Sequence, residues 1–346
     1  MPNLTMEEKY HLITRNLQEI IGGNRLKEIL HERNLKIYWG TAPTGKPHIG
    51  YLIPMLKIAD FLKAECTVTI LIADLHAYLD MKTTLDQVQS RIIFYKLLIV
   101  SILESLDVPT DKLSFVVGTS FQLSHNYTLD AYKLFTKITE HDAKRAGSDV
   151  VKQIKNPVMS SLIYPGLQAL DEEYLDVDAQ FGGVDQRKIF VLAEKYLPAI
   201  GYAKRIHLMN KMVPGLSGSK MSSSDLKGKI EILDDPDTVT KKINSIFCEE
   251  GNVVNNGLLS FLENVLFSNI FPTFKNGDVI YSDFEKLKHD FANKLIHPKD
   301  FKQNVSIAIN NIIAPIRQLY FSNENAHEII QNAYSDCYAS QNNTIP

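Results

Sequence analysis

The sequence predicts an α/β protein in which a parallel β-sheet, covered by helices on both faces, precedes a second and mainly helical domain. Over the first two thirds of the chain, short apolar runs alternate with helical stretches, which is the strand–helix–strand order of a buried parallel sheet. After the Gly/Ser/Lys-rich stretch GLSGSKMSSSDLKGK, strand patterns become rare. The length of 346 residues also exceeds what one hydrophobic core usually supports, so we expect two domains, 1–228 and 229–346.

Each element is predicted from its local pattern. One long helix is expected over residues 6–33, with Thr5 as its N-cap and Glu8 three residues later completing a capping box. Strands are predicted from apolar runs at 36–39, 67–73, 114–117, 175–181 and 205–208. Helices of the first domain are predicted near 50–63, 85–105, 127–155, 156–173 and 186–197. Those of the second domain are predicted at 235–246, 258–266, 283–295, 300–319 and 324–334.

Composition excludes several classes of protein. Hydrophobic residues make up 45% of the chain and charged residues 22%, as in an ordinary globular protein, and no apolar run reaches the roughly 18 residues of a membrane span. The N-terminal stretch lacks the basic-then-apolar order of a signal peptide, so we expect a cytoplasmic protein. Cys66, Cys248 and Cys337 are far apart and without Cys-x-x-Cys spacing, so we expect reduced thiols and no protein-bound metal.

The charge distribution limits how a polyanion could bind. The formal net charge is −3, so a polyanionic partner would need local basic patches. Residues 133–155 carry six basic side chains against three acidic ones, and residues 203–229 carry six against one. An ordinary solvated surface is the alternative for both windows.

The stretch PTGKPHIGYL, residues 43–52, lies just after the first predicted strand. Open parallel sheets bind ligands beyond the carboxyl ends of their strands. Gly45 and Gly50 permit close backbone approach, and Pro47 can begin a helix. His48 is then expected in the first helical turn, where free N–H groups and the helix dipole favour a phosphate. A buried histidine that bonds its neighbours is the alternative.

Two further stretches carry groups that could meet the same ligand. In YPGLQALDEEYL, Tyr164, Gln168 and Asp171 are spaced so that they share one face of a helix. In QFGGVDQRK, two glycines permit close backbone approach after a strand, and Asp185 and Gln186 follow. A solvated helix face with a structural turn is the alternative for this segment.

A third stretch is KMSSS, Lys220–Ser224, in the Gly-rich loop after the α/β part. Its lysine could close over a polyphosphate and supply charge to oxygens that become more negative in the transition state. A solvated lysine in a flexible loop is the alternative.

Taken together, these motifs resemble those of the class I aminoacyl-tRNA synthetases. The stretches KIYWGTAPTGKPHIGYLIPMLKIADFLKA, ILIADLHAYLD, LIYPGLQALDEEYLDVDAQFGGVDQRKIF and MVPGLSGSKMSSS resemble more closely the tyrosine enzymes of the eukaryotic and archaeal cytosolic type, over about residues 7–320. The resemblance implies a Rossmann-like catalytic domain, with a dimer-interface insertion at about 118–165 and a mobile loop at 215–228, followed by a helical anticodon-binding domain. It also implies that tyrosine and ATP, with Mg²⁺, form tyrosyl-adenylate and that a homodimer transfers tyrosine to tRNA(Tyr).

The resemblance further implies a role for each matching residue. His48 and Lys220 would be catalytic and would hold the ATP phosphates. Tyr38 and Asp171 would bind the phenolic hydroxyl of tyrosine. The other expected tyrosine ligands are Tyr164, Gln168 and Gln186, with His76, Phe121 and Gln122 lining the pocket. The other expected ATP ligands are Gly45, Gly50, Gly183, Asp185, Met221, Ser222, Ser223 and Ser224.

The resemblance also implies contacts with tRNA. The stretch HPKD, His297–Asp300, is similar to the segment that reads the first anticodon base, where Asp300 could accept from a guanine edge and Phe274 could stack on the base. The alternative for His297 is a place beside a helix N-cap. The candidates for the acceptor end are Lys144, Arg145 and Arg187, with ordinary surface charge as their alternative.

Some positions depart from the family pattern. Tyr51 stands where the first signature has its second histidine, and Ser223 stands where the second signature has its second lysine. Residues 86–93, DQVQSRII, lack the Glu-Leu-Arg that some animal members carry, so no signalling role of that kind is expected. We also expect no appended tRNA-binding domain, so that affinity for tRNA comes from the core and its dimer.

Two other functions have to be weighed against the tyrosine enzyme. A tryptophan enzyme of the same chemistry would not need the pair Tyr38 and Asp171 around a phenol. A non-catalytic RNA-binding module built on such a fold would keep the basic patches and lose His48, Lys220 or the polar face of 164–171. Because all of these are present, the sequence favours the tyrosine enzyme.

Overall fold

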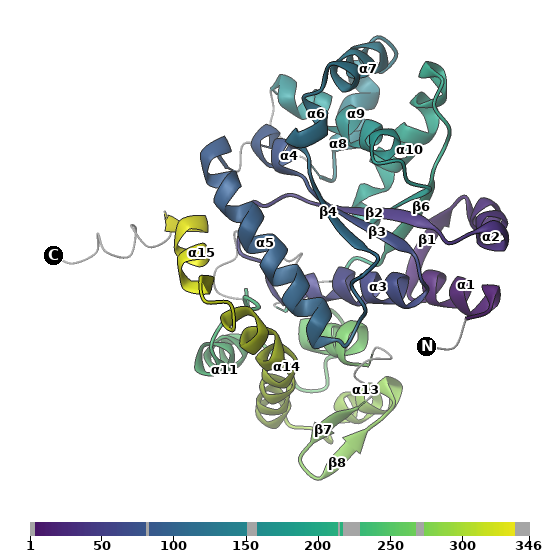
Figure 1. Ribbon diagram of the computed structural model, residues 1–346. Coiled ribbons are helices and arrows are strands. Elements are labelled where there is room, and N and C mark those ends of the chain that lie inside the picture. Colours follow the sequence, from purple (N-terminus) through teal and green to yellow (C-terminus); the bar gives the residue numbers. More distant parts are fainter. Residues whose placement is uncertain are drawn as a thin grey trace.

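The computed structural model contains a six-stranded sheet with helices on both faces, and further helices gathered beside it (Figure 1). It describes residues 4–80, 83–150, 158–213, 215–216, 229–267 and 273–335. The strands lie in the order β1 (Leu17–Ile21), β6 (Ile206–Asn210), β5 (Ala179–Gly183), β2 (Lys36–Thr41), β3 (Thr67–Ile72) and β4 (Leu113–Val117). Neighbouring strands are parallel except β1 and β6, which are antiparallel. The predicted α/β class is therefore confirmed.

The helices connect the strands and then continue into the C-terminal part. Those of the first part are α1 (Met6–Thr14), α2 (Gly23–Glu32), η1 (Ile49–Tyr51), α3 (Leu52–Lys63), α4 (Asp74–Leu79), α5 (Leu85–Ser105), α6 (Thr119–Gln122), α7 (His125–Phe135), α8 (Glu140–Gly147), α9 (Met159–Tyr174), η2 (Val184–Gln186), α10 (Arg187–Tyr196) and η3 (Pro198–Ile200). Those of the second part are α11 (Pro236–Ser245), α12 (Gly257–Phe261), the π-helical η4 (Leu262–Leu266), α13 (Phe284–Ala292), α14 (Pro298–Phe321) and α15 (Ala326–Ala333).

The prediction of one helix over residues 6–33 is wrong. The capping box of Thr5 and Glu8 begins α1 as expected, but a strand, β1, separates α1 from α2. The backbone has positive φ at Asn16 (61°) and Gly22 (84°), on either side of β1, and such angles are incompatible with a continuous helix. Pairing of this segment with β6 at the sheet edge replaces the helix that its local pattern favoured.

Three smaller differences also come from local breaks. The helix predicted over 127–155 divides into α7 and α8, because Thr139 caps a new helix with its side chain. Strand β5 starts at Ala179 rather than at 175, after Asp176 with a φ of 49°. A two-stranded hairpin of β7 (Phe274–Asn276) and β8 (Val279–Tyr281) lies in the part expected to be helical.

Helix α5 joins the sheet to the C-terminal helices. It packs against α14 and α15, as Figure 1 also shows, and the ring of Phe94 lies 5.7 Å from that of Tyr320 and 5.1 Å from that of Tyr334. Buried Arg91 donates to the carbonyl of Ala333 (3.0 Å) and to that of Thr44 (2.7 Å). One hydrophobic core therefore runs through both parts, and the division near residue 228, which lies outside the described residues, stays a prediction.

The remaining sequence predictions concern membranes and thiols. No helix within the described ranges is long and apolar enough to cross a membrane. Cys66 is a buried free thiol, and burial raises its pKa to about 12, so it is a poor nucleophile near neutral pH. Cys248 is also free, and Cys337 lies outside the described residues.

Candidate active site

Two adjoining cavities lie at the carboxyl ends of β2 and β5. The inner cavity has a volume of about 280 Å³ and the outer one about 250 Å³, and they share a wall formed by Trp39, Phe181, Gly182 and Gly183. Steric reasons explain why the two positions are glycines. A Cβ on Gly182 would lie 3.0 Å from the ring of Phe190, and one on Gly183 would lie 2.4 Å from the carboxylate of Asp185. Side chains at these positions would displace the residues that shape the wall.

The inner cavity brings together the residues expected to bind tyrosine. Its lining includes Tyr38 from β2, Tyr164, Gln168 and Asp171 from α9, Gln186 from η2, and His76 from α4. The polar face predicted on 164–171 therefore points into a cavity and not into solvent. Gln168 Nε2 donates to Gln186 Oε1 (3.0 Å), which fixes two of these side chains relative to each other.

Asp171 is the only carboxylate of this lining that is fully buried among the described residues. Its Oδ1 accepts from Gln122 Nε2 and from the hydroxyl of Tyr127, each at 2.8 Å. Its Oδ2 has no partner within the described part of the chain. Burial raises the pKa of Asp171 to about 8, against the opposing effect of the two hydrogen bonds. A buried polar oxygen without a partner is costly, so Oδ2 is placed to form a hydrogen bond with a ligand.

The neighbouring aromatic groups are held neutral. Burial, together with the charge of Asp171, raises the pKa of Tyr38 well above its ordinary value, and its hydroxyl lies 3.4 Å from the carbonyl of Gln168. Burial lowers the pKa of His76 to about 4, so its ring is neutral at neutral pH. That ring meets Tyr164 edge-on, with centroids 4.5 Å apart. The end of the cavity therefore offers one carboxyl group among neutral phenol and imidazole groups.

Two residues expected in the pocket lie behind it. Phe121 and Gln122 are not part of the lining; Phe121 packs against the ring of Tyr127 at 5.6 Å, and Gln122 reaches the cavity only through Asp171. Tyr127 was not anticipated from the sequence. It lies within the helical pattern expected for 127–155, and its inward position marks it only as a core residue.

The outer cavity is lined by His48, Gly50, Gly183 and Asp185, together with residues 210–213. His48 precedes the helical turn expected to contain it: it is the N-cap of η1, and its Nδ1 accepts from the amide of Gly50 at 3.1 Å. The neutral ring therefore carries its proton on Nε2. Burial, with the positive charge of Lys229, lowers the pKa of His48 to about 4.

Several expected ATP ligands are elsewhere or outside the described residues. Gly45 lines neither cavity, and its carbonyl accepts from Tyr95. Tyr51 points away from the outer cavity, with its ring against Trp39 at 5.4 Å and its hydroxyl bonded to Thr41. Lys220, Met221, Ser222, Ser223 and Ser224 lie outside the described residues.

The segment that follows this loop is attached to the His48 corner. The amide of Ile49 donates to the carbonyl of Ile230 (2.9 Å), and the amide of Ile232 donates to the carbonyl of Pro47 (3.1 Å). The residues that follow the KMSSS loop are thus anchored beside His48 by main-chain hydrogen bonds.

The expected tRNA contacts have mixed outcomes. Phe274 is only 1% exposed and packs on Phe301 at 6.0 Å, so the expectation that it stacks on an anticodon base is wrong. His297 is itself the N-cap of α14, with Nδ1 accepting from the amide of Lys299 at 3.2 Å. Asp300, in the first turn of α14, is exposed to solvent.

The basic candidates for the acceptor end are partly neutralised. Lys144 pairs with Glu140 at 2.5 Å, and Arg187 pairs with Glu19 through two contacts of 2.7 and 2.9 Å. Arg145 and Arg187 line the same surface depression, of about 150 Å³. Other cations of the two basic windows, Lys133, Lys204, Arg205 and Lys229, also lie beside carboxylates.

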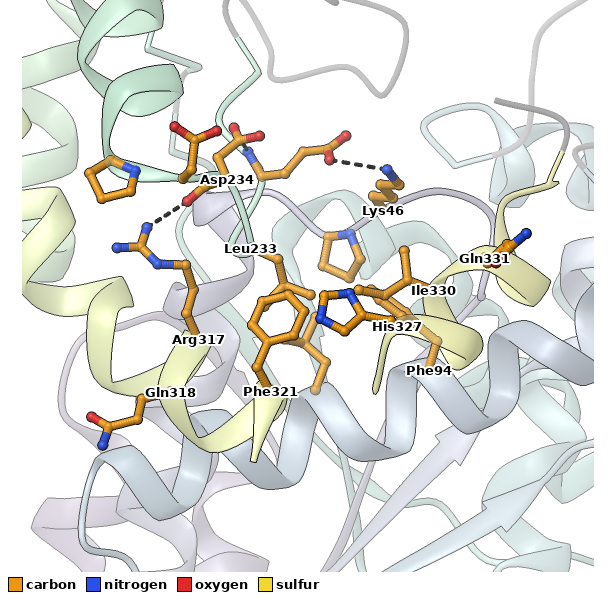
Figure 2. Close-up of a pocket in the computed structure, with 15 residues that line it drawn as sticks. Lys46, Phe94, Leu233, Asp234, Arg317, Gln318, Phe321, His327, Ile330 and Gln331 are labelled. Atoms are coloured by element: carbon orange, nitrogen blue, oxygen red, sulfur yellow. Dashed lines mark hydrogen bonds and ion pairs between the residues drawn. The ribbon is translucent and has the colours of Figure 1, made fainter. Parts of the chain in front are cut away.

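The largest described cavity lies elsewhere, between α5, α14, α15 and residues 231–236, with a volume of about 910 Å³ (Figure 2). Arg317 donates to the carbonyl of Asp234, as Figure 2 shows. The ammonium of Lys46 lies 3.7 Å from the carboxylate of Glu231. None of the expected site residues lines it. Cavity size alone therefore does not identify the active site of this protein.

A polar cavity adjoins, through a glycine wall, a second cavity with a histidine-capped helix start at the carboxyl edge of a parallel sheet, which is where open α/β sheets bind their ligands. The chain belongs to the class I tRNA synthetases (W and Y), whose family pattern matches residues 30–314.

Several similar proteins bear a more specific name. The chain is 58% identical over 341 residues to a zebrafish (Danio rerio) protein named cytoplasmic tyrosine–tRNA ligase, covering 96% of this chain and 64% of that protein. It is 52% identical to the Saccharomyces cerevisiae protein of the same name, covering 94% of this chain and 88% of that one. The crystal structure of an Archaeoglobus fulgidus tyrosyl-tRNA synthetase with L-tyrosine superimposes with a TM-score of 0.83 at 33% identity, covering 91% and 99% of the two chains. The chain thus spans less than two thirds of the length of the zebrafish relative.

Proposed function

We propose that this protein is a tyrosine–tRNA ligase, which activates L-tyrosine with ATP to tyrosyl-adenylate and transfers tyrosine to the 3′-terminal adenosine of tRNA(Tyr), releasing AMP and diphosphate. The observation that carries the proposal is the free Oδ2 of Asp171 beside Tyr38, at the end of a cavity that adjoins the His48 cavity. The relatives' name supports a cytoplasmic location.

The inner cavity selects the amino acid. The phenolic hydroxyl of tyrosine donates to Asp171 and meets Tyr38, while Tyr164, Gln168 and Gln186 bind the amino group. Phenylalanine would leave Asp171 and Tyr38 without a partner, and rejection on this basis reaches about 10⁵ in the enzyme type that serves as the standard example. Tryptophan has no hydroxyl to offer at this place, so the pair favours tyrosine over the tryptophan alternative.

The outer cavity holds ATP. His48 donates from Nε2 to a phosphate oxygen without adding a charge, and Gly50 lies beside it. Gly183 and Asp185 meet the ribose, and Lys220, with Met221 and Ser222 to Ser224, closes over the phosphates and neutralises the leaving diphosphate. The substrate carboxylate is already a nucleophile, so the protein needs no nucleophile of its own. Mg²⁺ would enter on the ATP phosphates, where it supplies additional positive charge.

A homodimer is the proposed assembly, through the region 118–165. Large apolar side chains are exposed on this region: Leu123 (65%), Leu129 (45%), Tyr132 (64%), Val158 (40%) and Met159 (71%). Apolar side chains left exposed on a protein surface can mark a protein–protein interface, so these side chains are the candidates for the contact between two copies. We expect substitution of Leu129 and Tyr132 by aspartate to give monomers by light scattering. A dimer of unchanged stability would show that the interface lies elsewhere.

The tRNA would contact both parts of the chain. Asp300 is proposed to accept from the first anticodon base, with His297 holding the start of α14 in place. Arg145 and Arg187 are proposed to contact the acceptor end, because they line one depression on the catalytic part. Lys144, which is paired with Glu140, is the weaker candidate.

Tyrosine-dependent exchange of pyrophosphate into ATP tests the proposal. We expect exchange with tyrosine, little with phenylalanine or tryptophan, and loss of exchange in His48→Ala. Exchange with tryptophan alone would establish the tryptophan enzyme. The absence of exchange with every amino acid, in a protein that still binds tRNA, would establish the non-catalytic module.

A further inference from the structure

Tyr127 is a buried residue that contacts the substrate-facing carboxylate and has no role in the function described so far. It lies on α7, is 1% exposed, and places its hydroxyl 2.8 Å from Asp171 Oδ1 and 2.9 Å from the carbonyl of Leu167. Edge-on contacts with the rings of Phe121 (5.6 Å) and Tyr174 (4.8 Å) hold its ring. The hydroxyl therefore has a fixed position and a choice of two acceptors.

The two donors to Asp171 meet the same oxygen. Gln122 Nε2 lies 2.8 Å from Oδ1, at the same distance as the hydroxyl of Tyr127, while Oδ2 has no partner among the described residues. The two oxygens of a carboxylate are chemically equivalent. Donors on one of them therefore decide which oxygen turns toward the inner cavity, and they leave Oδ2 as the one that a ligand can reach.

The single proton of Tyr127 also responds to the charge of its neighbour. An ionised carboxylate is a stronger acceptor than a peptide carbonyl, so the hydroxyl donates to Asp171 when that group is charged. When Asp171 is protonated, the hydroxyl can donate to Leu167 instead. Burial works against ionisation of Asp171, and the bonds from Gln122 and Tyr127 work for it.

We propose that Tyr127 is a specificity-determining positioning residue, which favours the ionised form of Asp171 and aims its Oδ2 at the phenolic hydroxyl of the substrate. This inference rests on the proposed function. An ionised and aimed Oδ2 makes the loss of a hydroxyl costly, because phenylalanine would leave a buried charge unpaired. Without the Tyr127 hydroxyl, Asp171 becomes protonated more readily and phenylalanine is rejected less strongly.

Tyr127→Phe tests the proposal, because it removes the hydroxyl and keeps the ring contacts. We expect kcat/KM for tyrosine in pyrophosphate exchange to fall about tenfold or more near neutral pH, as for a hydrogen bond to a charged group. We expect kcat/KM for phenylalanine to fall far less, so that discrimination narrows. The acid limb of the pH profile of kcat/KM for tyrosine should move up by about one pH unit, since the carboxylate loses a donor.

Tyr174→Phe is the matched control. Tyr174 lies beside Tyr127, but its hydroxyl donates to Asp130 Oδ2 (2.8 Å) and has no contact with Asp171. We expect this variant to keep the wild-type discrimination and pH profile. Gln122→Met is a second variant that removes the other donor to Oδ1, and we expect it to shift discrimination and the pH profile in the same direction as Tyr127→Phe.

The outcomes separate the inference from the function on which it rests. A wild-type protein without tyrosine-dependent exchange overturns the proposed function. An active wild-type protein whose Tyr127→Phe variant keeps both the discrimination ratio and the acid limb overturns the role of Tyr127 alone. Equal losses for tyrosine and phenylalanine at every pH would show that the hydroxyl only supports the fold.

Discussion

The imidazole of His48 caps the amide of Gly50 with Nδ1, at 3.1 Å, so that its other nitrogen faces the outer cavity as a donor. Burial and the charge of Lys229 lower the pKa of this ring to about 4. His48 is therefore a neutral, fixed donor at neutral pH, so in the proposed function its contribution to phosphate binding would come from direction and not from charge.

Replacing His48 by alanine should slow adenylate formation by about 10² to 10³, the usual cost of losing a donor aimed at a developing charge. The KM for tyrosine should stay nearly constant, because the ring does not line the inner cavity. Rapid-quench measurement of adenylate formation checks this. Because the pKa of His48 is about 4, this ring does not change its charge between pH 6 and 8. The rate of adenylate formation should therefore not depend on its titration in that range. A rate that depends on an ionisation of this ring near pH 6.5 would contradict the assignment.

Replacing Asp171 by asparagine should reduce activity with tyrosine and stabilise the fold at high pH. The pKa of Asp171 rises from 3.8 to about 8 on folding, so protonation of Asp171 favours the folded state. This contribution to the free energy of unfolding is complete below about pH 4 and is lost as pH rises through about 8. The gain in free energy of unfolding in Asp171→Asn should therefore be larger at pH 9 than at pH 5. Urea denaturation at both pH values measures it, and an equal gain at the two values would show that Asp171 has an ordinary pKa.

A side chain at Gly183 should weaken ATP binding and spare tyrosine binding. The added Cβ would lie 2.4 Å from Asp185 Oδ1 and would displace that carboxylate from the wall of the outer cavity. We expect the KM for ATP of Gly183→Ala to rise about tenfold, the effect of one lost hydrogen bond to a charged group. Gly23→Ala is the control, because the nearest atom would be 3.8 Å away.

The attachment of α15 to α5 should depend on Arg91. Arg91→Met keeps much of the side-chain volume but leaves the carbonyls of Ala333 and Thr44 unpaired, and we expect the free energy of unfolding to fall by about 2–4 kcal/mol. Arg33→Met removes an arginine that is half-exposed and paired with Asp178, and it should cost about 1 kcal/mol or less. Similar losses in the two variants would mean that the buried contacts do not hold the C-terminal helices.

Asp300→Ala should separate tRNA charging from amino acid activation. The residue is exposed in the first turn of α14 and lines neither carboxyl-edge cavity, so pyrophosphate exchange should be unchanged. If Asp300 reads a guanine edge, kcat/KM for tRNA(Tyr) should fall about tenfold or more. Glu285→Ala, at another exposed carboxylate on α13, should leave charging unaffected.

Periodicity predicted most of the fold because most elements follow their own local patterns. Thr84 caps helix α5, which covers residues 85–105 as expected, since its capping box and its apolar stripe agree. The segment of β1 could not be predicted in this way. Its five residues, LQEII, have no strand-like alternation of polar and apolar residues, and only pairing with β6, about 190 positions further along the chain, makes it a strand.

Site residues could be predicted where they share a local motif on one helix. They could not be predicted where their contacts join segments that are far apart in the sequence. The face of Tyr164, Gln168 and Asp171 follows from helical geometry and does line a cavity. The hydroxyl of Tyr127 meets Asp171 across 44 positions, and no local pattern distinguishes it from another core tyrosine. The burial of Phe274 depends on the hairpin of β7 and β8, whose presence the helical pattern of the surrounding residues obscured.

One face of helix α7 is buried, and the opposite face is exposed to solvent. On one side, Tyr127, Ala131 and Leu134 are buried; on the other, Leu129 and Tyr132 are exposed. One helix of 11 residues therefore carries both the hydroxyl that meets Asp171 and the apolar side chains proposed for the contact between two copies.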